Sequence, residues 1–379
     1  SGTERLDPAR PGWRVAVGAA CWLLLTATSA VGVAPDDELL AQQWNLEQIG
    51  AADAWARSTG TGVNIGVVDS GIDADHPDLA GKIVALADCT GGPCREGGAP
   101  DGDGHGTSVA GVAAAATGNG LGIAGVAPDA QLVVAKVLDD DGTGEIEDIS
   151  SGIRWVVDHG ARVVSLSLGD PAAVFSRAGN SLEPAIQYAW SRGAIPVLAA
   201  GNYNPGVLGT ISAGYGNLNA VVVGATDRTG RVAFYSTPLG NAKWGIVAPG
   251  GNGQGVGEDI LSPDPGDGYG WHAGTSLAVP HVSGALALLL AQGLGQQEAV
   301  GRLLDTLDTS QPCGDGCRGR LRADAAVNVT GAIGPAPTTT PAAPESDGGG
   351  GSAAPVAITG IGLLVGAVVA TVLLVRRRR

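Results

Sequence analysis

Short runs of apolar, often β-branched residues recur along the middle of the chain without polar interruptions. Strands that are buried on both faces of a parallel sheet have this continuous pattern, whereas half-exposed strands alternate apolar and polar residues. We therefore expect strands of a mostly parallel sheet at five positions. The runs cover residues 63–68, 132–137, 163–168, 194–199 and 220–225.

Between several of these runs, apolar residues recur every three or four positions, which is the spacing of an amphipathic helix. The spacing predicts helices over 146–159 and 181–192, and the apolar segment 278–292 predicts a central helix. Alternating strands and helices are typical of an α/β domain with three layers. Ligands of such domains bind at the carboxyl ends of the strands, so polar residues just after each run are candidates for chemistry.

The composition narrows the class of protein. Apolar residues make up 44% of the 379 residues, which excludes a disordered chain, and the 63 glycines have no collagen-like period. The net charge of −15 argues against a nucleic-acid partner, because phosphate binding relies on Lys and Arg. The negative charge lies in 35–330, since the segments on either side are both net positive.

Both ends of the chain have the patterns of targeting segments. In 1–34, arginines precede an apolar stretch that fades into small residues, which predicts a signal peptide; an uncleaved N-terminal anchor is the alternative. The apolar, uncharged segment 355–375 precedes four arginines at 376–379, which predicts a transmembrane helix with a cytoplasmic tail. The Pro-, Thr- and Gly-rich segment 331–354 is typical of a linker. We therefore expect a single-pass cell-membrane protein whose domain 35–330 is extracellular.

The cysteines of the central domain agree with export. Cys89, Cys94, Cys313 and Cys317 allow three disulfide pairings. Short loops close with the smallest loss of entropy, which favours Cys89–Cys94 and Cys313–Cys317. A zinc site is the alternative, although neither pair has the usual spacing of two intervening residues.

Polar residues that could carry out chemistry lie beside the expected elements. Asp69 and Asn202 each follow an apolar run. His105 lies in a Gly-rich segment before a small-residue helix, and Ser276 comes just before the apolar segment 278–292. Alone, each of them could be a helix cap or a turn residue. Together, Asp69, His105 and Ser276 supply the orienting acid, base and nucleophile that acyl transfer by serine needs. The Asn202 side chain can donate a hydrogen bond to the oxyanion.

The segments around these residues, VVDSGID, GHGTSVAG, AAGN and GTSLAVPHVSG, resemble the four signature motifs of the subtilisin-like serine proteases, the subtilases. The segments TGNGLGIAGVAPDAQLVVAKVLDDDGTGEI and GARVVSLSLG are most similar to thermitase-type members. The resemblance covers about residues 36–329 and implies a three-layer subtilisin-like fold with a mostly parallel sheet. It also implies a serine endopeptidase that acts on proteins or peptides. The triad would be Asp69, His105 and Ser276, the oxyanion hole would include Asn202, and no catalytic metal is expected.

The resemblance further implies where a substrate and a metal ion bind. A peptide would lie as an extended strand between two backbone segments, next to a P1 pocket with small walls. The implied substrate-binding residues are Gly142, Gly144, Ser167, Leu168, Gly169, Ala199, Ala200 and Gly201. A structural calcium ion would be held by oxygen atoms of Asp36, Asp78, Thr117, Asn119, Leu121 and Ile123.

The residues around this cleft predict a preference among substrates. The uncharged walls of the P1 pocket favour a small or apolar side chain in the substrate. Five carboxylates crowd the other rim and favour basic residues further from the scissile bond, by charge complementarity; a merely solvated acidic loop is the alternative. These carboxylates belong to Asp139, Asp140, Asp141, Glu145 and Glu147.

Two features depart from the usual subtilase pattern. Leu277 stands where most subtilases have an oxidation-prone Met, so we expect tolerance to peroxide. The linker, span and basic tail resemble the architecture of the mycosins, membrane-anchored subtilases of type VII secretion systems, which implies partners in a membrane secretion complex. The alternatives are a general degradative surface protease, a secretion-complex scaffold with secondary protease activity, and an esterase.

Overall fold

The structure is a computed structural model that describes residues 35–168, 181–202 and 215–329 of the chain. The predicted signal peptide at 1–34 and the predicted linker, span and arginine tail at 331–379 lie outside the described residues. Within the described ranges, no helix is both long and apolar enough to cross a membrane.

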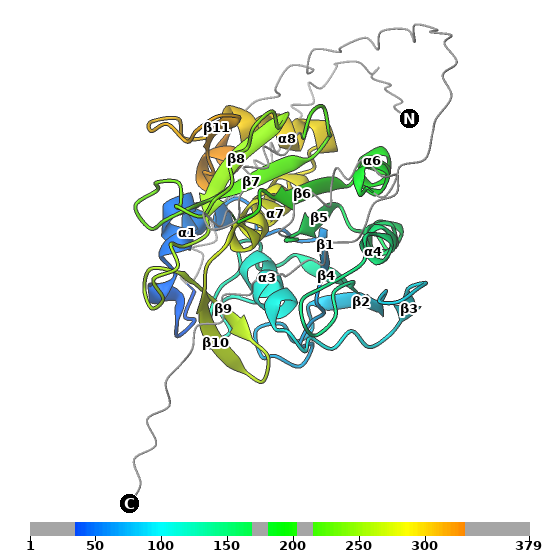
Figure 1. Cartoon of the computed structure of the whole chain (residues 1–379). Coiled ribbons are helices and arrows are strands. Elements are labelled where there is room, and N and C mark those ends of the chain that lie inside the picture. Colours follow the sequence, from blue (N-terminus) through cyan, green and yellow to red (C-terminus); the bar gives the residue numbers. More distant parts are fainter. Residues whose placement is uncertain (1–34, 169–180, 203–214, 330–379) are drawn as a thin grey trace, which may run out of the picture. The chain divides into compact units, whose positions relative to one another are not determined.

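The described residues form a nine-stranded sheet in the order β11-β8-β7-β6-β5-β1-β4-β2-β3, shown in Figure 1. Its pairings are parallel except that of β2 with β3, and β9 and β10 form a separate antiparallel pair. The five predicted strands are therefore confirmed as β1 and β4 to β7. The strands are β1 (Asn64–Asp69), β2 (Ile83–Asp88), β3 (Arg95–Glu96), β4 (Gln131–Lys136), β5 (Val163–Leu166), β6 (Ile195–Ala199), β7 (Val221–Thr226), β8 (Trp244–Pro249), β9 (Ile260–Asp264), β10 (Gly268–His272) and β11 (Cys317–Arg320).

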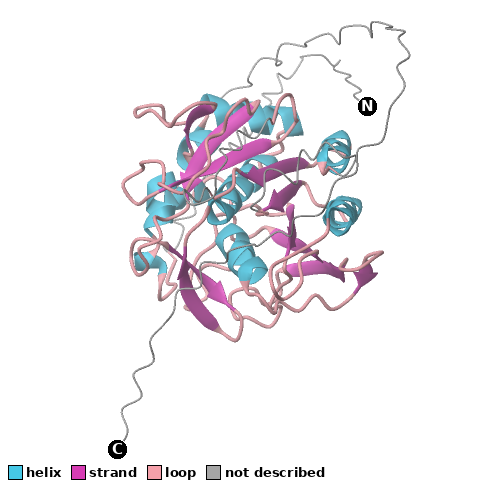
Figure 2. Cartoon of the chain, in the orientation of Figure 1, coloured by secondary structure: helices cyan, strands magenta, loops and turns pink. Residues whose placement is uncertain are grey.

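Helices cover both faces of the sheet, as the colouring of Figure 2 makes clear. Helices α3 and α7 pack on one face, and α4 and α6 pack on the other, which gives the three predicted layers. The predicted helices over 146–159, 181–192 and 278–292 are confirmed as α4, α6 and α7. The helices are η1 (Leu40–Gln42), α1 (Trp44–Ile49), α2 (Ala51–Trp55), α3 (His105–Ala114), α4 (Ile146–Asp158), α6 (Glu183–Ser191), α7 (Thr275–Ala291), α8 (Gln296–Asp305) and α9 (Ala323–Asn328).

The continuous apolar runs divide residue by residue between the two faces of the sheet. In β1, Ile65 and Val67 belong to the apolar cluster that includes α3 and α7, whereas Val68 belongs to the cluster that includes α4 and α6. In β4, Leu132 belongs to the cluster that includes α3 and α7, and Val133 belongs to the cluster that includes α4 and α6. Successive side chains of a strand point to opposite faces, so only an uninterrupted apolar run satisfies both layers.

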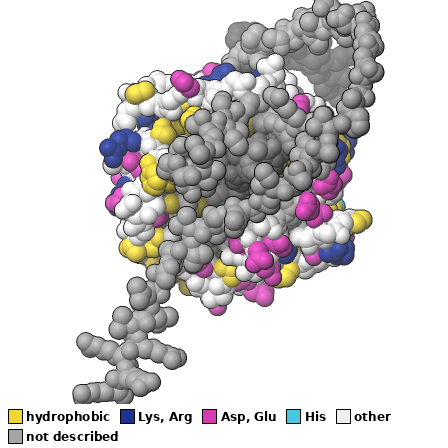
Figure 3. Space-filling view, viewed as in Figure 1, with side chains coloured by type: hydrophobic (Ala, Val, Ile, Leu, Met, Phe, Trp, Pro, Cys, Tyr) yellow, Lys and Arg dark blue, Asp and Glu magenta, His cyan; other side chains and the backbone are white. Residues whose placement is uncertain are grey.

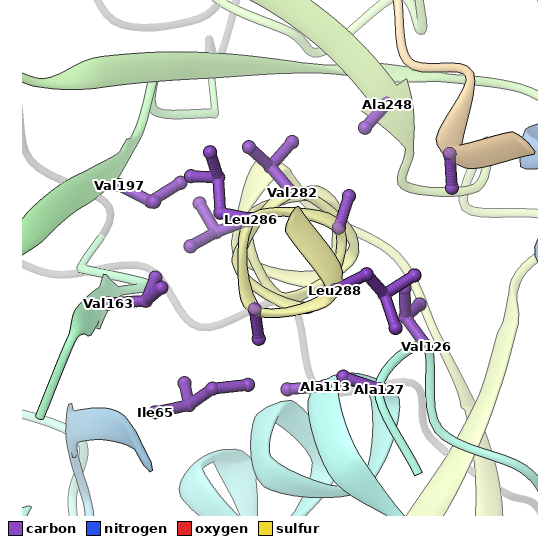
Figure 4. Close-up of a cluster of buried hydrophobic side chains, with 14 of the residues drawn as sticks. Ile65, Ala113, Val126, Ala127, Val163, Val197, Ala248, Val282, Leu286 and Leu288 are labelled. Carbon is purple, nitrogen blue, oxygen red and sulfur yellow. The ribbon is translucent and has the colours of Figure 1, made fainter. Parts of the chain in front are cut away.

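Helix α7 forms the centre of the larger apolar cluster, shown in Figure 4. Its residues Val282 and Leu286 pack toward the sheet, where Val163 and Val197 lie, and Leu288 points toward another part of the cluster. Leu286 is fully buried, so its replacement by Ala is expected to cost about 2–5 kcal/mol of folding free energy. A helix that is apolar around its whole circumference must be surrounded by other elements. This packing holds α7, and with it the first turn of α7, in a defined position against the sheet.

Both favoured disulfides are present, one between Cys89 and Cys94 and the other between Cys313 and Cys317. Each closes a short loop at the sheet: Cys89 follows β2, and Cys317 begins β11. All four sulfur atoms are bonded to one another in pairs, so the zinc alternative is wrong.

Candidate active site

Asp69 and His105 form a hydrogen-bonded pair at the carboxyl edge of the sheet. Asp69 ends β1 and is fully buried, and His105 begins α3. The Nδ1 atom of His105 lies 2.7 Å from Oδ1 of Asp69. An ionised carboxylate only accepts hydrogen bonds, so Nδ1 donates its proton and Nε2 remains available as a base.

The electrostatic surroundings favour the protonated form of His105. Burial by itself lowers its pKa, but the Asp69 carboxylate outweighs burial and, with Asp103 and Asp101, raises the pKa to about 9. About 30% of the His105 side chain is exposed, so its outer edge reaches solvent. The imidazole is thus positioned to stabilise a positive charge, and it must lose a proton before it can act as a base.

A network of hydrogen bonds around the partly buried Asp101 holds the loop that carries His105. The Asp101 carboxylate accepts hydrogen bonds from Ser70 Oγ at 2.8 Å, from the Gly104 N–H, and from both the N–H and the hydroxyl of Thr107. Ser70 Oγ in turn accepts a bond from the Gly106 N–H. These bonds join the residue after Asp69 to the first turn of α3, so they fix the two members of the pair relative to each other. We did not predict this role for Asp101, because it lies three residues before Gly104, the N-cap of α3, and so outside the usual capping position.

Close backbone approach also explains why glycine follows His105. A Cβ atom on Gly106 would stand 2.2 Å from the carbonyl oxygen of Gly71, a separation that no side chain can adopt. The first turn of α3 therefore lies directly against the chain that leaves β1, and only glycine permits this contact.

Ser276 lies in the first turn of α7, and Asn202 lies beside that turn. Asn202 Oδ1 accepts hydrogen bonds from the N–H and the hydroxyl of Thr275, at 2.9 and 3.1 Å. Its Nδ2 therefore points away from Thr275. A Cβ atom on Gly274 would stand 2.9 Å from Ser276 Oγ and 3.4 Å from Asn202 Nδ2, so Gly274 leaves open the space between these two groups.

The carbonyl group of Ser276 is bonded across to the sheet rather than along the helix. Pro280 lies one turn later in α7 and has no N–H, so it cannot donate to the carbonyl four residues before it. Ser167, which follows β5, supplies the missing donor through its hydroxyl at 2.9 Å. The turn that carries Ser276 is thereby attached to β5.

The first turns of α3 and α7 lie at the same edge of the sheet, because His105 bonds to Asp69 at the end of β1 and Ser276 bonds to Ser167 after the neighbouring strand β5. In the described part of the chain, no hydrogen bond joins Ser276 Oγ to His105. Enzymes without bound substrate often have a long nucleophile–base separation that shortens when substrate binds. The described geometry thus contains an oriented base, a hydroxyl at a helix N-terminus and an amide donor beside it.

The implied substrate-binding segments follow neighbouring strands. Ser167 and Leu168 follow β5, and Ala200 and Gly201 follow β6, its partner in the sheet. Both segments contact the start of α7, because Ser167 bonds to Ser276 and the Gly201 N–H bonds to the Thr275 hydroxyl at 3.2 Å. Gly169 lies outside the described residues.

The residues implied for calcium also come together. One oxygen of Asp78 lies 3.2 Å from Asn119 Nδ2, and the other accepts bonds from the Ile123 N–H and the Tyr269 hydroxyl. Asp36 accepts a bond from the N–H of Gly120. Two carboxylates thus face the loop 117–123, and this set of hard oxygen atoms fits calcium in type. Among the described residues, no group of three or more His, Cys, Asp or Glu side chains is arranged to hold a metal ion.

The sequence did not predict the part that Asp37 has in this loop. Asp37 is buried and accepts bonds from the Thr117 hydroxyl and from the N–H groups of Gly118 and Asn119. It therefore holds the start of the loop through three hydrogen-bond donors.

Comparisons with known proteins identify the family of this chain. The model of the Subtilase family matches residues 60–311. Thermitase from Thermoactinomyces vulgaris is 36% identical over 296 residues, which cover 77% of this chain and 98% of thermitase. Subtilisin Savinase from Lederbergia lenta is 40% identical over 250 residues, which cover 65% of this chain and 83% of that protein. A protease from Pseudoalteromonas arctica has a solved structure that matches with a TM-score of 0.66 and 30% identity, over 78% of this chain and 99% of that one.

Proposed function

The chain belongs to the subtilase family and is a serine endopeptidase, and from this premise we propose that Asp69, His105, Ser276 and Asn202 carry out the reaction together. The observation that carries the proposal is the 2.7 Å hydrogen bond between His105 and the buried Asp69, at the edge of the sheet where the first turn of α7 also lies. This bond leaves the Nε2 edge of the imidazole as the group that exchanges protons with a substrate.

In the acylation step, Ser276 Oγ attacks the scissile carbonyl carbon and His105 Nε2 takes the hydroxyl proton. Asp69 keeps the imidazole in the required tautomer and stabilises its positive charge. The oxyanion accepts hydrogen bonds from Asn202 Nδ2 and from the N–H of Ser276, one of the helix N–H groups without an intrahelical partner. His105 then gives its proton to the leaving amine, and the C–N bond breaks.

In the deacylation step, water replaces the amine that has left. His105 takes a proton from this water, whose oxygen attacks the acyl carbon, and the second oxyanion is held by the same two donors. The bond to Ser276 Oγ then breaks, His105 returns the proton to that oxygen, and the new carboxylic acid leaves. The Thr275 bonds to Asn202 Oδ1 keep Nδ2 directed at the oxyanion throughout, so no reorganisation is needed.

Labelling with a fluorophosphonate tests these roles directly. The full chain is expected to be labelled on Ser276, and the Ser276→Ala variant is expected to remain unlabelled although it folds. Labelling of Asp69→Asn should be slower by orders of magnitude, because the base loses its orientation. Labelling at another serine, or equal labelling of wild type and Asp69→Asn, would contradict the proposed roles.

We further propose that the enzyme cleaves after small or apolar residues and prefers basic residues further from the bond. The support is the uncharged character of the segments after β5 and β6 and the acidic loop after β4. Acidic side chains gather in the lower part of the face shown in Figure 3. A peptide library would refute the second part if cleavage favoured acidic residues at those subsites.

The location proposed for the peptidase is the outer face of the cell membrane. It rests on the sequence patterns of 1–34, 331–354 and 355–379, and on membership of a family with secreted proteases. Protease treatment of intact cells is expected to remove the domain and leave the C-terminal tail in the membrane fraction. A domain that stays protected until the cells are lysed would refute this location.

Within that location, we propose a mycosin-like role in a type VII secretion complex. The predicted linker, span and basic tail support this role, because they resemble the architecture of the mycosins. Ser276→Ala separates this role from a scaffold, because a scaffold keeps its cellular role when the nucleophile is lost. A general degradative protease would instead cleave many unrelated proteins and would not copurify with secretion components.

A structural calcium ion is also part of the proposal. Asp36, Asp78, Asn119 and carbonyl groups of the loop 117–123 would hold it, and it would neutralise carboxylates that now face N–H and O–H donors. Thermal unfolding with and without a chelator tests this, with Asp78→Asn as the variant expected to lose the difference. An unfolding temperature that chelator leaves unchanged would refute a stabilising calcium ion.

A further inference from the structure

The loop after β4, residues 138–145, is closed on itself by one carboxylate. Asp139 accepts bonds from the N–H of Asp141 and from the N–H and hydroxyl of Thr143, and its own N–H donates to the Thr143 carbonyl at 2.7 Å. Gly142 provides the positive φ of 72° that this tight turn needs. The loop is therefore a compact unit, and its position depends on how it is attached to the rest of the domain.

The loop lies against the segment that precedes His105. A Cβ atom on Gly102 would stand 2.3 Å from Cγ of Asp140, and a Cβ atom on Gly142 would stand 3.2 Å from a carboxylate oxygen of Asp103. The two segments thus fit together at two glycines. Carboxylates of both segments meet there, so the contact needs a positive charge to stabilise it.

Lys136 supplies that charge from inside the protein. It ends β4 and pairs in register with Asp69, and its side chain is about 9% exposed. Its Nζ donates to the Ser70 carbonyl at 2.7 Å and to Asp140 Oδ1 at 2.9 Å. One buried ammonium group therefore joins the residue after Asp69 to the loop 138–145.

We propose that Lys136 is a positioning residue that holds the loop 138–145 in register with Asp69 and His105, and so determines where a peptide substrate lies. The inference rests on the proposed function and on the family resemblance, which implies that Gly142 and Gly144 bind one side of the substrate. A lysine suits this place because its ammonium group is a compact charge with three donors, so it can serve a carbonyl and a carboxylate at once.

The chain offers a matched control for this proposal in Lys82. This lysine is buried like Lys136, with 9% of the residue exposed against 7% for Lys136. It lies just before β2, which neighbours β4, and donates its Nζ to the carbonyl of Pro128. Both lysines therefore donate Nζ to a backbone carbonyl, but Lys82 does so at the amino end of the strands and Lys136 at the carboxyl end. Replacement of either lysine by Met removes a buried ammonium group and keeps the length of the side chain.

The test compares Lys136→Met with Lys82→Met in the full chain, purified in detergent, on an extended peptide substrate and on a fluorophosphonate. We expect Lys136→Met to raise KM for the peptide about 10-fold and to change kcat and the labelling rate less than about 3-fold. Lys82→Met should lower the unfolding temperature and leave KM unchanged. Lys136→Arg should restore KM to within about 2-fold, since the charge and the N–H donors remain.

The Asp140→Asn variant provides a second test of the same inference if the Lys136→Met variant does not fold. The Asp140 side chain is about 74% exposed, so this variant is expected to fold, and on a peptide without basic residues it is expected to raise KM about 3-fold. An unchanged KM in these variants overturns the inference, as does an equal fall in peptide cleavage and labelling, which would place Lys136 at the chemical step. Failure of the proposed function would look different, because the wild-type chain itself would then lack Ser276-dependent labelling.

Discussion

Two histidines on the same face of the sheet, the partly exposed His105 and the fully buried His281, have opposite proton affinities. His105, at the start of α3, faces the Asp69 carboxylate, which raises its pKa to about 9 against the effect of burial. His281, within α7, faces the amide of Asn45 at 2.8 Å, and burial lowers its pKa to about 4 although the Leu277 carbonyl accepts its Nδ1 proton. The comparison teaches that burial alone keeps a histidine neutral, and that one buried carboxylate reverses this.

The largest expected effect comes from removal of that carboxylate. Asp69→Asn is expected to lower kcat about 10⁴-fold, because the amide favours the wrong imidazole tautomer and does not stabilise the imidazolium. Steady-state kinetics on a peptide substrate measure this, with the unfolding temperature as the control for intact structure. A loss of only a few-fold would mean that His105 is oriented by something other than Asp69.

The next effect concerns stability in acid and depends on His281. Its pKa is about 4 in the folded chain against an ordinary value of 6.5, so as the pH falls through this window the unfolded chain takes up the proton first. The free energy of unfolding is therefore expected to fall by about 3 kcal/mol between pH 6.5 and 4 from this group. Urea unfolding of the Ser276→Ala chain, which cannot digest itself, measures the slope.

Asn45→Asp provides the matched variant for this measurement. It places a carboxylate against His281 and so imitates the surroundings of His105, which should raise the His281 pKa and flatten the slope between pH 6.5 and 4. A slope that stays the same in this variant would show that the acid sensitivity comes from other groups.

A smaller effect is expected on the pH dependence of activity. Only neutral His105 can accept the Ser276 proton, so kcat/KM should rise with pH, with a midpoint above 6.5 and toward 9. Asp103→Asn removes one of the outer carboxylates that raise this pKa and should lower the midpoint by about 0.3 unit. The shift should shrink at high salt, since Asp103 is exposed; a salt-independent shift would contradict the electrostatic cause.

The smallest effect concerns Leu277, which follows Ser276 and whose carbonyl accepts the Nδ1 proton of His281. Its side chain is buried beside Trp44, Val112 and Ile260, and it contains no sulfur that peroxide can oxidise. Peroxide treatment is therefore expected to lower the activity of the wild-type protein less than about 2-fold. The same treatment should remove most of the activity of the Leu277→Met variant. Equal losses in both proteins would place the sensitive group elsewhere.

Much of the fold follows from local pattern, because strands buried on two faces need uninterrupted apolar runs. Strand β2 was missed because most of its side chains are only partly buried, and α1 and α2 are too short for periodicity to detect. The triad candidates and Asn202 were predicted from their segments. Contacts outside these segments were not predicted, since nothing near Asn45 in the sequence indicates that it faces a histidine 236 residues away.

Pro280 makes two distant positions of this sequence depend on each other. Because the proline withholds a donor from the Ser276 carbonyl, the hydroxyl of Ser167 becomes part of what keeps the nucleophile's turn in shape. The two residues therefore have to be changed together. Alanine at position 167 removes the hydroxyl that donates to the Ser276 carbonyl, and only a residue with an N–H at position 280 could replace that donor.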